Sequence, residues 1–164
     1  ISVEKKNLIL FHLQGQHVTP SGRFPHDTFK HFTADSIKRN DAFLTNEMKE
    51  YIADYDNATL YNDYVMSRIF DTFKDSNTVL IYFSDHGEEA YDYRKQCGRD
   101  HGEITPMMLK YQFEIPFVIW CSDIYKKNQA YSRDCLYYFG NSHRKRNRFD
   151  SIFLFGMVER KCYE

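Results

Sequence analysis

The chain has 164 residues, of which 42% are hydrophobic and 17% aromatic, so it can bury the core of one globular domain and is not a disordered chain. Its formal net charge of -1 gives no field that favours nucleic acid or a lipid surface. No apolar run reaches the roughly 18 residues of a membrane-spanning helix, and no signal peptide is recognisable.

The first predicted element is a strand from Asn7 to Leu13, a nearly continuous apolar run. Such a run, without polar alternation, is typical of a strand buried on both faces, as in a parallel sheet. It is followed at its carboxyl end by Gly15 and His17. The chain enters this strand almost at once, so we expect it to begin inside a larger protein.

A long helix is predicted from Asp41 to Lys74, after a loop broken by prolines and glycine. Apolar residues recur there at helical spacing and should share one face: Phe43, Met48, Ile52, Tyr55, Leu60, Tyr64, Ile69 and Phe73. The helix would be the crossover between two parallel strands. Asp56, Asn57 and Asp63 carry metal-type donors, but adjacent helix positions point different ways, which favours a solvated or supporting role.

The central predicted strand, Thr78 to Phe83, leads directly into Ser84-Asp85-His86-Gly87-Glu88. Chemistry in parallel sheets lies at the carboxyl ends of strands. Asp85 offers a hard oxygen and His86 a borderline nitrogen, a pair that suits zinc or a similar divalent ion. On the tripeptide alone, an ordinary turn after a strand is the alternative.

A polar, tyrosine-rich loop follows and ends in a second histidine motif. Arg99 and His101 are suited to a phosphate or sulfate oxygen, and His101 also to a metal, although a plain loop histidine is the alternative. A third buried strand is predicted from Glu114 to Ser122. The four cysteines form no CxxC pair, which argues against a cysteine zinc site and leaves thiols or disulfides open.

Together these motifs resemble the alkaline-phosphatase superfamily, most closely the sulfatase-fold catalytic domain of bacterial phosphoethanolamine transferases. The matching segments are His12 to His17, Tyr55 to Tyr61, Ser84 to Glu88, His101-Gly102 and Ile115 to Trp120. The resemblance implies an α/β fold with three layers, α/β/α, around a mostly parallel sheet. It implies only part of that fold: residues 1–164 would be the C-terminal portion of the catalytic domain, with the tail from about residue 131 unmatched.

The resemblance also implies roles for single residues. Asp85 and His86 would bind the catalytic zinc, and His17 and His101 would hold the substrate phosphate or a second zinc. Glu88 would orient these ligands by hydrogen bonds, and His12 would lie near the substrate pocket. Two-step phosphoryl transfer through a threonine, with phosphatidylethanolamine as donor and lipid A or lipopolysaccharide core as acceptor, is the chemistry implied.

The nucleophilic threonine and its acidic zinc-ligand partner would lie upstream of the chain, since the residues before His17 carry no such motif. We therefore expect no catalytic nucleophile among these residues, one or two weakly held zinc ions, and no turnover by the chain alone. The parent protein would be anchored in the bacterial inner membrane by absent N-terminal segments, with its catalytic domain in the periplasm and no nucleic-acid partner.

Two alternatives remain from the sequence. One is a sulfatase or phosphodiesterase of the same fold. The other is a non-catalytic, sulfatase-like binding domain, whose many tyrosine and phenylalanine residues would suit carbohydrate or protein contacts.

Overall fold

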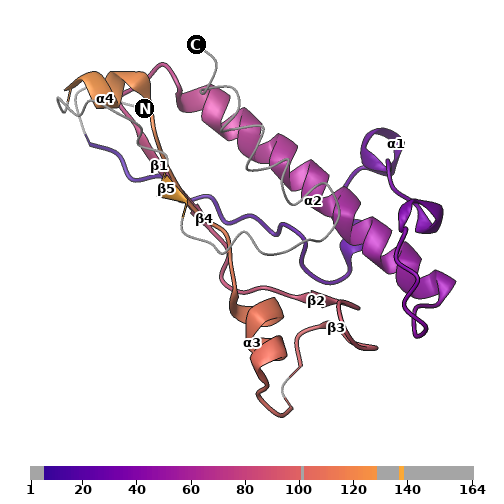
Figure 1. The fold of residues 1–164 in the computed structure, drawn as a ribbon. Helices are drawn as coiled ribbons and strands as arrows, with labels where there is room; N and C mark the ends of the chain where they lie inside the picture. The colour runs from indigo at the N-terminus through magenta and orange to yellow at the C-terminus, as the bar shows by residue number, and fades with distance from the viewer. Residues whose placement is uncertain (1–5, 101, 129–136, 139–164) are drawn as a thin grey trace.

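The computed structural model describes residues 6–100, 102–128 and 137–138, which form one long helix against a small sheet (Figure 1). Among the described residues, no helix combines the length and apolarity that a membrane span requires. The elements follow in chain order: 3-10 turns Pro20–Gly22 and Ala34–Ser36 around helix α1 (His26–Phe29), helix α2 (Asn46–Phe73), strands β1 (Val79–Phe83), β2 (Glu89–Ala90) and β3 (Cys97–Gly98), helix α3 (Pro106–Phe113), strand β4 (Phe117–Cys121), helix α4 (Asp123–Asn128) and strand β5 (Tyr137–Tyr138).

Helix α2 confirms the predicted long helix as one unbroken element of 28 residues. It begins after Thr45, whose side-chain oxygen accepts a hydrogen bond from the Met48 backbone N–H at 3.2 Å. Its buried face differs from the predicted apolar stripe, since Tyr64 is exposed and two asparagines are buried. The buried residues are Ile52, Ala53, Asn57, Ala58, Asn62, Met66 and Phe70.

The sheet of the described residues has the order β1-β4-β5, and both of its pairings are antiparallel. Val79 lies opposite Cys121 and Phe83 opposite Phe117. The α/β class is confirmed, but the predicted mostly parallel sheet is wrong for these strands. The apolar runs signalled strands without specifying partner or direction, and the segment between β1 and β4 turns the chain back instead of crossing over.

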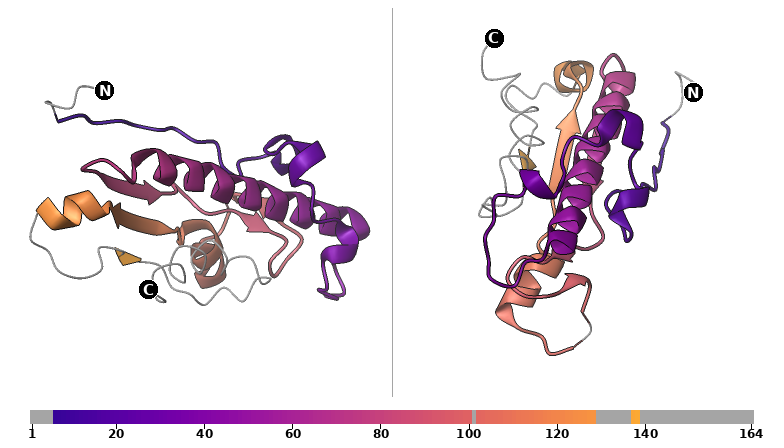
Figure 2. Two further views of the ribbon diagram at one scale, coloured as in Figure 1. Left: turned by 90° about the horizontal axis from the view of Figure 1, so that it is seen from above. Right: turned by 90° about the vertical axis from the view of Figure 1, so that its right-hand side faces the viewer.

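The predicted first strand, Asn7 to Leu13, is not a strand in the structure. It runs extended beside α2 (Figure 2). The Phe11 ring meets the Phe73 ring edge-on at 6.2 Å between centroids. Leu8 and Leu10 are exposed. Among the described residues this run is not paired with another strand, which a sheet strand requires.

Helix α2 covers one face of the sheet, as Figure 2 shows. The Phe70 ring meets the Trp120 ring of β4 at 5.1 Å, and the Asn62 side-chain amide donates to the Tyr82 hydroxyl at 3.0 Å. The opposite side of β1 is open to solvent, with Ile81 55% and Phe83 59% exposed. The described residues thus supply two of the three predicted layers.

At the end of the sheet where β1 finishes and β4 begins, the β2–β3 hairpin and α3 form a small unit (Figure 1). Thr105 caps α3 by accepting from the Met108 N–H at 3.1 Å. Ala90 of β2 joins Ile37, Ile52 and Ala53 in a buried cluster, which fastens the hairpin to the N-terminal half of α2. The turn between β1 and β2 lies between these two parts.

Candidate functional site

The turn that follows β1 carries the Asp85-His86 pair, and its backbone is closely held. The Ser84 hydroxyl donates to the His86 carbonyl at 2.7 Å, and the His86 N–H donates to the Asp85 carboxylate at 3.1 Å. The Gly87 N–H donates to the Gln112 carbonyl of α3 at 2.8 Å. A Cβ atom on Gly87 would lie 2.5 Å from the Tyr111 carbonyl oxygen, so this close approach to α3 requires glycine.

The ring of His86 is oriented by its own turn. Its Nδ1 lies 2.9 Å from the Gly87 carbonyl oxygen, and because a carbonyl only accepts, Nδ1 carries the proton in this hydrogen bond. Nε2 is then the nitrogen left to bind a metal, and it lies 3.6 Å from an Asp85 carboxylate oxygen. The Asp85 side chain is 87% exposed, whereas the His86 side chain is only 18% exposed, so the carboxylate faces solvent and the imidazole is largely covered.

Glu88 is buried directly behind this pair, and its Oε2 atom has no hydrogen-bond partner among the described residues. Burial raises the pKa of the Glu88 carboxyl and Asp85 adds to that rise, while His86, His17 and Arg99 oppose it. His17 and Arg99, from two other loops, therefore lie close enough to act electrostatically on the carboxyl next to the Asp85-His86 turn.

The His17 loop is fastened by Arg23. Its Nε donates to the His17 carbonyl at 2.9 Å and one Nη to the Val18 carbonyl at 2.6 Å, and the other Nη contacts the Gln14 side-chain oxygen. Gly15 turns this loop with a φ of 48°. The His17 side chain stays exposed, with its Nδ1 3.0 Å from the Val18 carbonyl oxygen.

Other predicted residues have different outcomes. His12 is exposed on the extended run before this loop. His101, Cys135 and Cys162 lie outside the described residues, and neither Cys97 nor Cys121 forms a disulfide within the part of the chain that the structure describes. Asn57 is a structural residue: its side chain accepts from the His31 and Phe32 N–H groups at 2.8 and 2.9 Å and donates to the Phe32 carbonyl at 2.9 Å.

The donor chemistry fits part of a zinc site. Asp85 and His86 supply an oxygen and a correctly protonated imidazole, two of the four ligands of a tetrahedral zinc. Within residues 6–100, 102–128 and 137–138, no three His, Cys, Asp or Glu side chains gather closely enough to hold a metal. The convergence of His17 and His101 on this pair therefore stays a prediction.

Polar residues that no sequence motif predicted lie near the turn. Arg94, in the β2–β3 loop, forms an ion pair with buried Glu89 at 2.6 Å, and its guanidinium lies over the Tyr93 ring. The Tyr93 ring in turn stacks on Tyr111 of α3 at 5.4 Å between centroids. No local motif signalled this arrangement, because charged residues in a tyrosine-rich loop are typical of a solvated surface.

Comparison with known families gives one match that covers most of the chain: the Sulfatase family matches residues 2–153. The chain is 38% identical over 120 residues to the phosphoethanolamine transferase EptC of Escherichia coli O18:K1:H7, which covers 72% of this chain and 20% of that protein. It is 31% identical over 127 residues to the Kdo(2)-lipid A phosphoethanolamine 7''-transferase of Escherichia coli K12, covering 76% of this chain and 21% of the relative. The chain thus spans about a fifth of the length of these relatives.

Two solved structures are similar to this chain. The C-terminal periplasmic domain of EptC from Escherichia coli is 34% identical with a TM-score of 0.61, and the match covers 72% of this chain and 33% of that one. The same domain in complex with Zn has a TM-score of 0.56, with 72% and 32% of the two chains covered.

Proposed function

The chain belongs to the sulfatase family, and on that premise we propose that it is the C-terminal portion of the catalytic domain of a zinc-dependent transferase. The enzyme would move phosphoethanolamine from phosphatidylethanolamine to lipid A or to a phosphate of the lipopolysaccharide core. Similarity to phosphoethanolamine transferases at 38% and 31% identity supports this activity. Because the chain spans about a fifth of those relatives, the activity is proposed for the longer protein.

One observation carries the proposal: the Asp85-His86 pair at the end of β1, with the imidazole held through Nδ1 and Nε2 left free. That arrangement is typical of histidines that bind zinc. The Zn complex of the similar EptC domain supports the choice of metal.

In this proposal Asp85 and His86 hold zinc, which when bound lowers the pKa of a hydroxyl nucleophile and neutralises charge on the phosphoryl oxygens. His17 and Arg99 donate hydrogen bonds to the substrate phosphate oxygens, and His101 does the same or binds a second zinc. Glu88, whose Oε2 atom has no hydrogen-bond partner among the described residues, would orient the histidine ligands by hydrogen bonds when the metal is bound. His12 lies at the margin of the substrate pocket.

The nucleophile is proposed to be a threonine outside residues 1–164, so the chain alone would bind zinc weakly and show no turnover. The reaction would take place on the periplasmic face of the bacterial inner membrane, where both lipid substrates are accessible. The periplasmic origin of the similar EptC domain supports this location.

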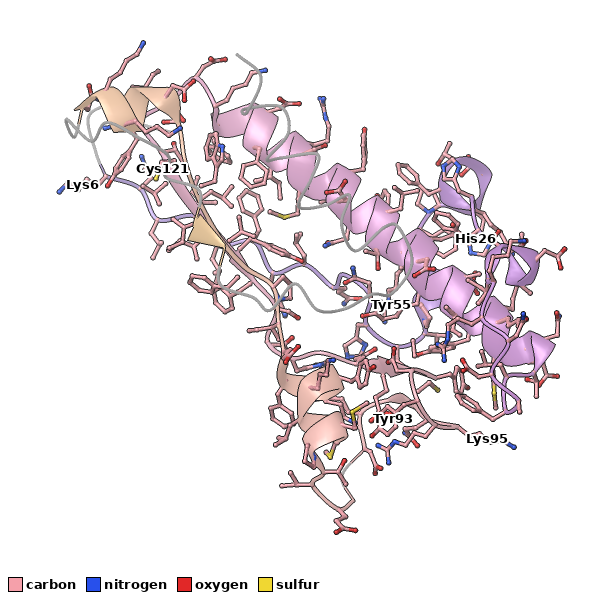
Figure 3. The ribbon with its side chains drawn as sticks, in the orientation of Figure 1. Lys6, His26, Tyr55, Tyr93, Lys95 and Cys121 are labelled. Carbon is pink, nitrogen blue, oxygen red and sulfur yellow. The ribbon has the colours of Figure 1, made fainter. Side chains whose placement is uncertain are left out.

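The test uses the full-length polypeptide that carries this chain, produced in Escherichia coli, with lipid A and core analysed by mass spectrometry. We expect added phosphoethanolamine with the unchanged protein and none with His86→Ala. The matched control is His26→Ala, since His26 is exposed on α1, on the other side of α2 from the β2–β3 hairpin (Figure 3). Unchanged phosphoethanolamine addition with His86→Ala would refute the assignment.

A second candidate is a sulfatase, favoured by the name of the family that matches residues 2–153. The same full-length protein should then hydrolyse an aryl sulfate and leave lipid A unmodified. Release of sulfate without transfer of phosphoethanolamine would decide for this candidate.

A further inference from the structure

We propose that four buried or half-buried residues, Glu89, Arg94, Asp100 and Gln112, position the candidate site by fixing the Asp85-His86 turn relative to the segment that carries Arg99. We call this group the brace. The inference rests on the proposed function for what the site binds, but the brace itself is defined by contacts alone. Its members are positioning residues, because they act through the turn and not on a substrate.

Glu89 is the centre of the brace. Its side chain has no exposed surface, yet it is charged, and such a buried carboxylate requires close partners. The Arg94 guanidinium donates to both of its oxygens, from Nε at 2.9 Å and from Nη2 at 2.6 Å. The Gln112 side-chain amide donates to Oε1 at 2.8 Å. Because the guanidinium bonds both carboxylate oxygens, it fixes the orientation of the Glu89 carboxylate relative to Arg94 as well as the distance between them.

The brace reaches the Arg99 segment through Asp100. The second Nη of Arg94 lies 3.1 Å from the Asp100 carboxylate. The Asp100 N–H donates to the Gln112 side-chain oxygen at 3.3 Å, and the Asp100 carboxylate accepts from the Gly102 N–H at 2.9 Å. The residue that follows Arg99 is therefore anchored by both its side chain and its backbone.

The brace reaches the Asp85-His86 turn through Gln112, whose backbone carbonyl accepts from the Gly87 N–H at 2.8 Å. The β1–β4 ladder ends at Phe83 and Phe117, so it holds only the start of the turn. The far end is held where Gly87 meets α3 and where Glu89 enters the brace. One residue of α3 thus contacts the turn, the buried carboxylate and the Arg99 segment.

The decisive variant is Arg94→Lys, which keeps the charge but cannot donate to two carboxylates in a fixed fork. The matched control is Arg68→Lys, at an exposed ion pair with Asp71 on α2. Zinc affinity of the 164-residue chain is measured with zinc chloride against a chelating dye, in the cold, where circular dichroism shows each variant folded. We expect Arg94→Lys to weaken zinc binding about tenfold and Arg68→Lys to leave it unchanged.

Hydrogen exchange supplies a readout that needs no metal. Peptides covering 84–90 and 97–100 should both lose protection in Arg94→Lys, while peptides from α2 keep theirs. Gln112→Leu is a second variant that retains the Glu89–Arg94 pair, and the same two segments should lose protection to a smaller degree. If Arg94→Lys fails to fold, the protection of the same two segments in Gln112→Leu tests the brace instead.

The outcomes separate the brace from the proposed function. Unchanged zinc affinity in a folded Arg94→Lys chain overturns the brace, as does loss of protection in only one of the two segments. If the unchanged chain binds no zinc but both segments lose protection together in the variant, the brace stands and the zinc function is what fails.

Discussion

Single side chains decide how the loops of this protein are attached to its helix and sheet. Asn57, buried on α2, makes three hydrogen bonds to the backbone of His31 and Phe32. The Arg23 side chain likewise donates hydrogen bonds to the carbonyls of His17 and Val18. Each uses a polar side chain to satisfy backbone groups that a loop cannot pair by itself.

Glu89 makes the stability of the chain dependent on pH. Burial alone would raise the pKa of its carboxyl, but the hydrogen bonds from Arg94 and Gln112 outweigh burial and the repulsion from Asp100, and hold the pKa below its ordinary value. A carboxyl whose folded pKa is depressed stabilises the folded state above its unfolded value and loses that contribution as the pH falls through the folded one. Stability should therefore decline as the pH falls below about 4.5.

Glu89→Gln tests this at the same residue. It should lower the free energy of unfolding at pH 7 by about 3 kcal/mol, because it leaves a half-buried guanidinium with one fewer carboxylate. It should also flatten the decline below pH 4.5. Urea unfolding at neutral and acid pH measures both effects, with the exposed Glu103→Gln as control. An equally steep acid decline in Glu89→Gln would contradict the role of this carboxyl.

Elements were predictable to the extent that the signal was local. The apolar run from Thr78 to Phe83 predicted β1, which begins at Val79, and the helical spacing from Asp41 to Lys74 predicted α2, which spans Asn46–Phe73. The partner of β1 was not predictable, because periodicity carries no information about pairing or direction. The Asp85-His86 pair was found from its place after a strand, whereas the brace was missed because Glu89, Arg94 and Gln112 are brought together only by folding.

The turn between β1 and β2 should not tolerate a side chain at Gly87. In Gly87→Ala the new Cβ would meet backbone at 2.5 Å, so α3 must shift and the hydrogen bond to Gln112 must lengthen. We expect weaker zinc binding and a loss of roughly 1–3 kcal/mol of stability. Calorimetric zinc titration and thermal unfolding measure these changes.

Gly22→Ala is the control for that substitution, since a Cβ there would meet no atom within 4 Å. It should leave both zinc binding and thermal unfolding unchanged. If both alanine variants have the same zinc affinity and thermal stability, the close approach of Gly87 to Tyr111 does not require glycine.

The whole molecule, as far as it is described, has one covered and one open side. α2 covers one face of the sheet, while Val79, Ile81 and Phe83 of β1 are exposed on the other. β1 is also the edge strand of the described sheet, so its outer backbone groups have no ladder partner there. An exposed apolar edge strand is a site for association with another chain.

We therefore expect the 164-residue chain to associate with itself as its concentration rises. Ile81→Lys should shift the population to smaller species without changing the circular dichroism spectrum, because a lysine on an edge strand opposes pairing. Sedimentation velocity over a range of concentrations measures this. Ile124→Lys, on α4 and outside the strands, should have no effect, and a monomer at every concentration in the unchanged chain would contradict the prediction.

The hydrogen bond between Gly87 and Gln112 constrains the register in which β1 pairs with β4. If β1 slipped by two residues along β4, Gly87 would move about 7 Å from Gln112, and a one-residue slip would turn Tyr82 away from Asn62. The hydrogen bonds that close the Asp85-His86 turn therefore favour the native alignment of β1 and β4. If this pair binds zinc as proposed, the fraction of chain that retains zinc should report the fraction whose strands are paired in the native alignment.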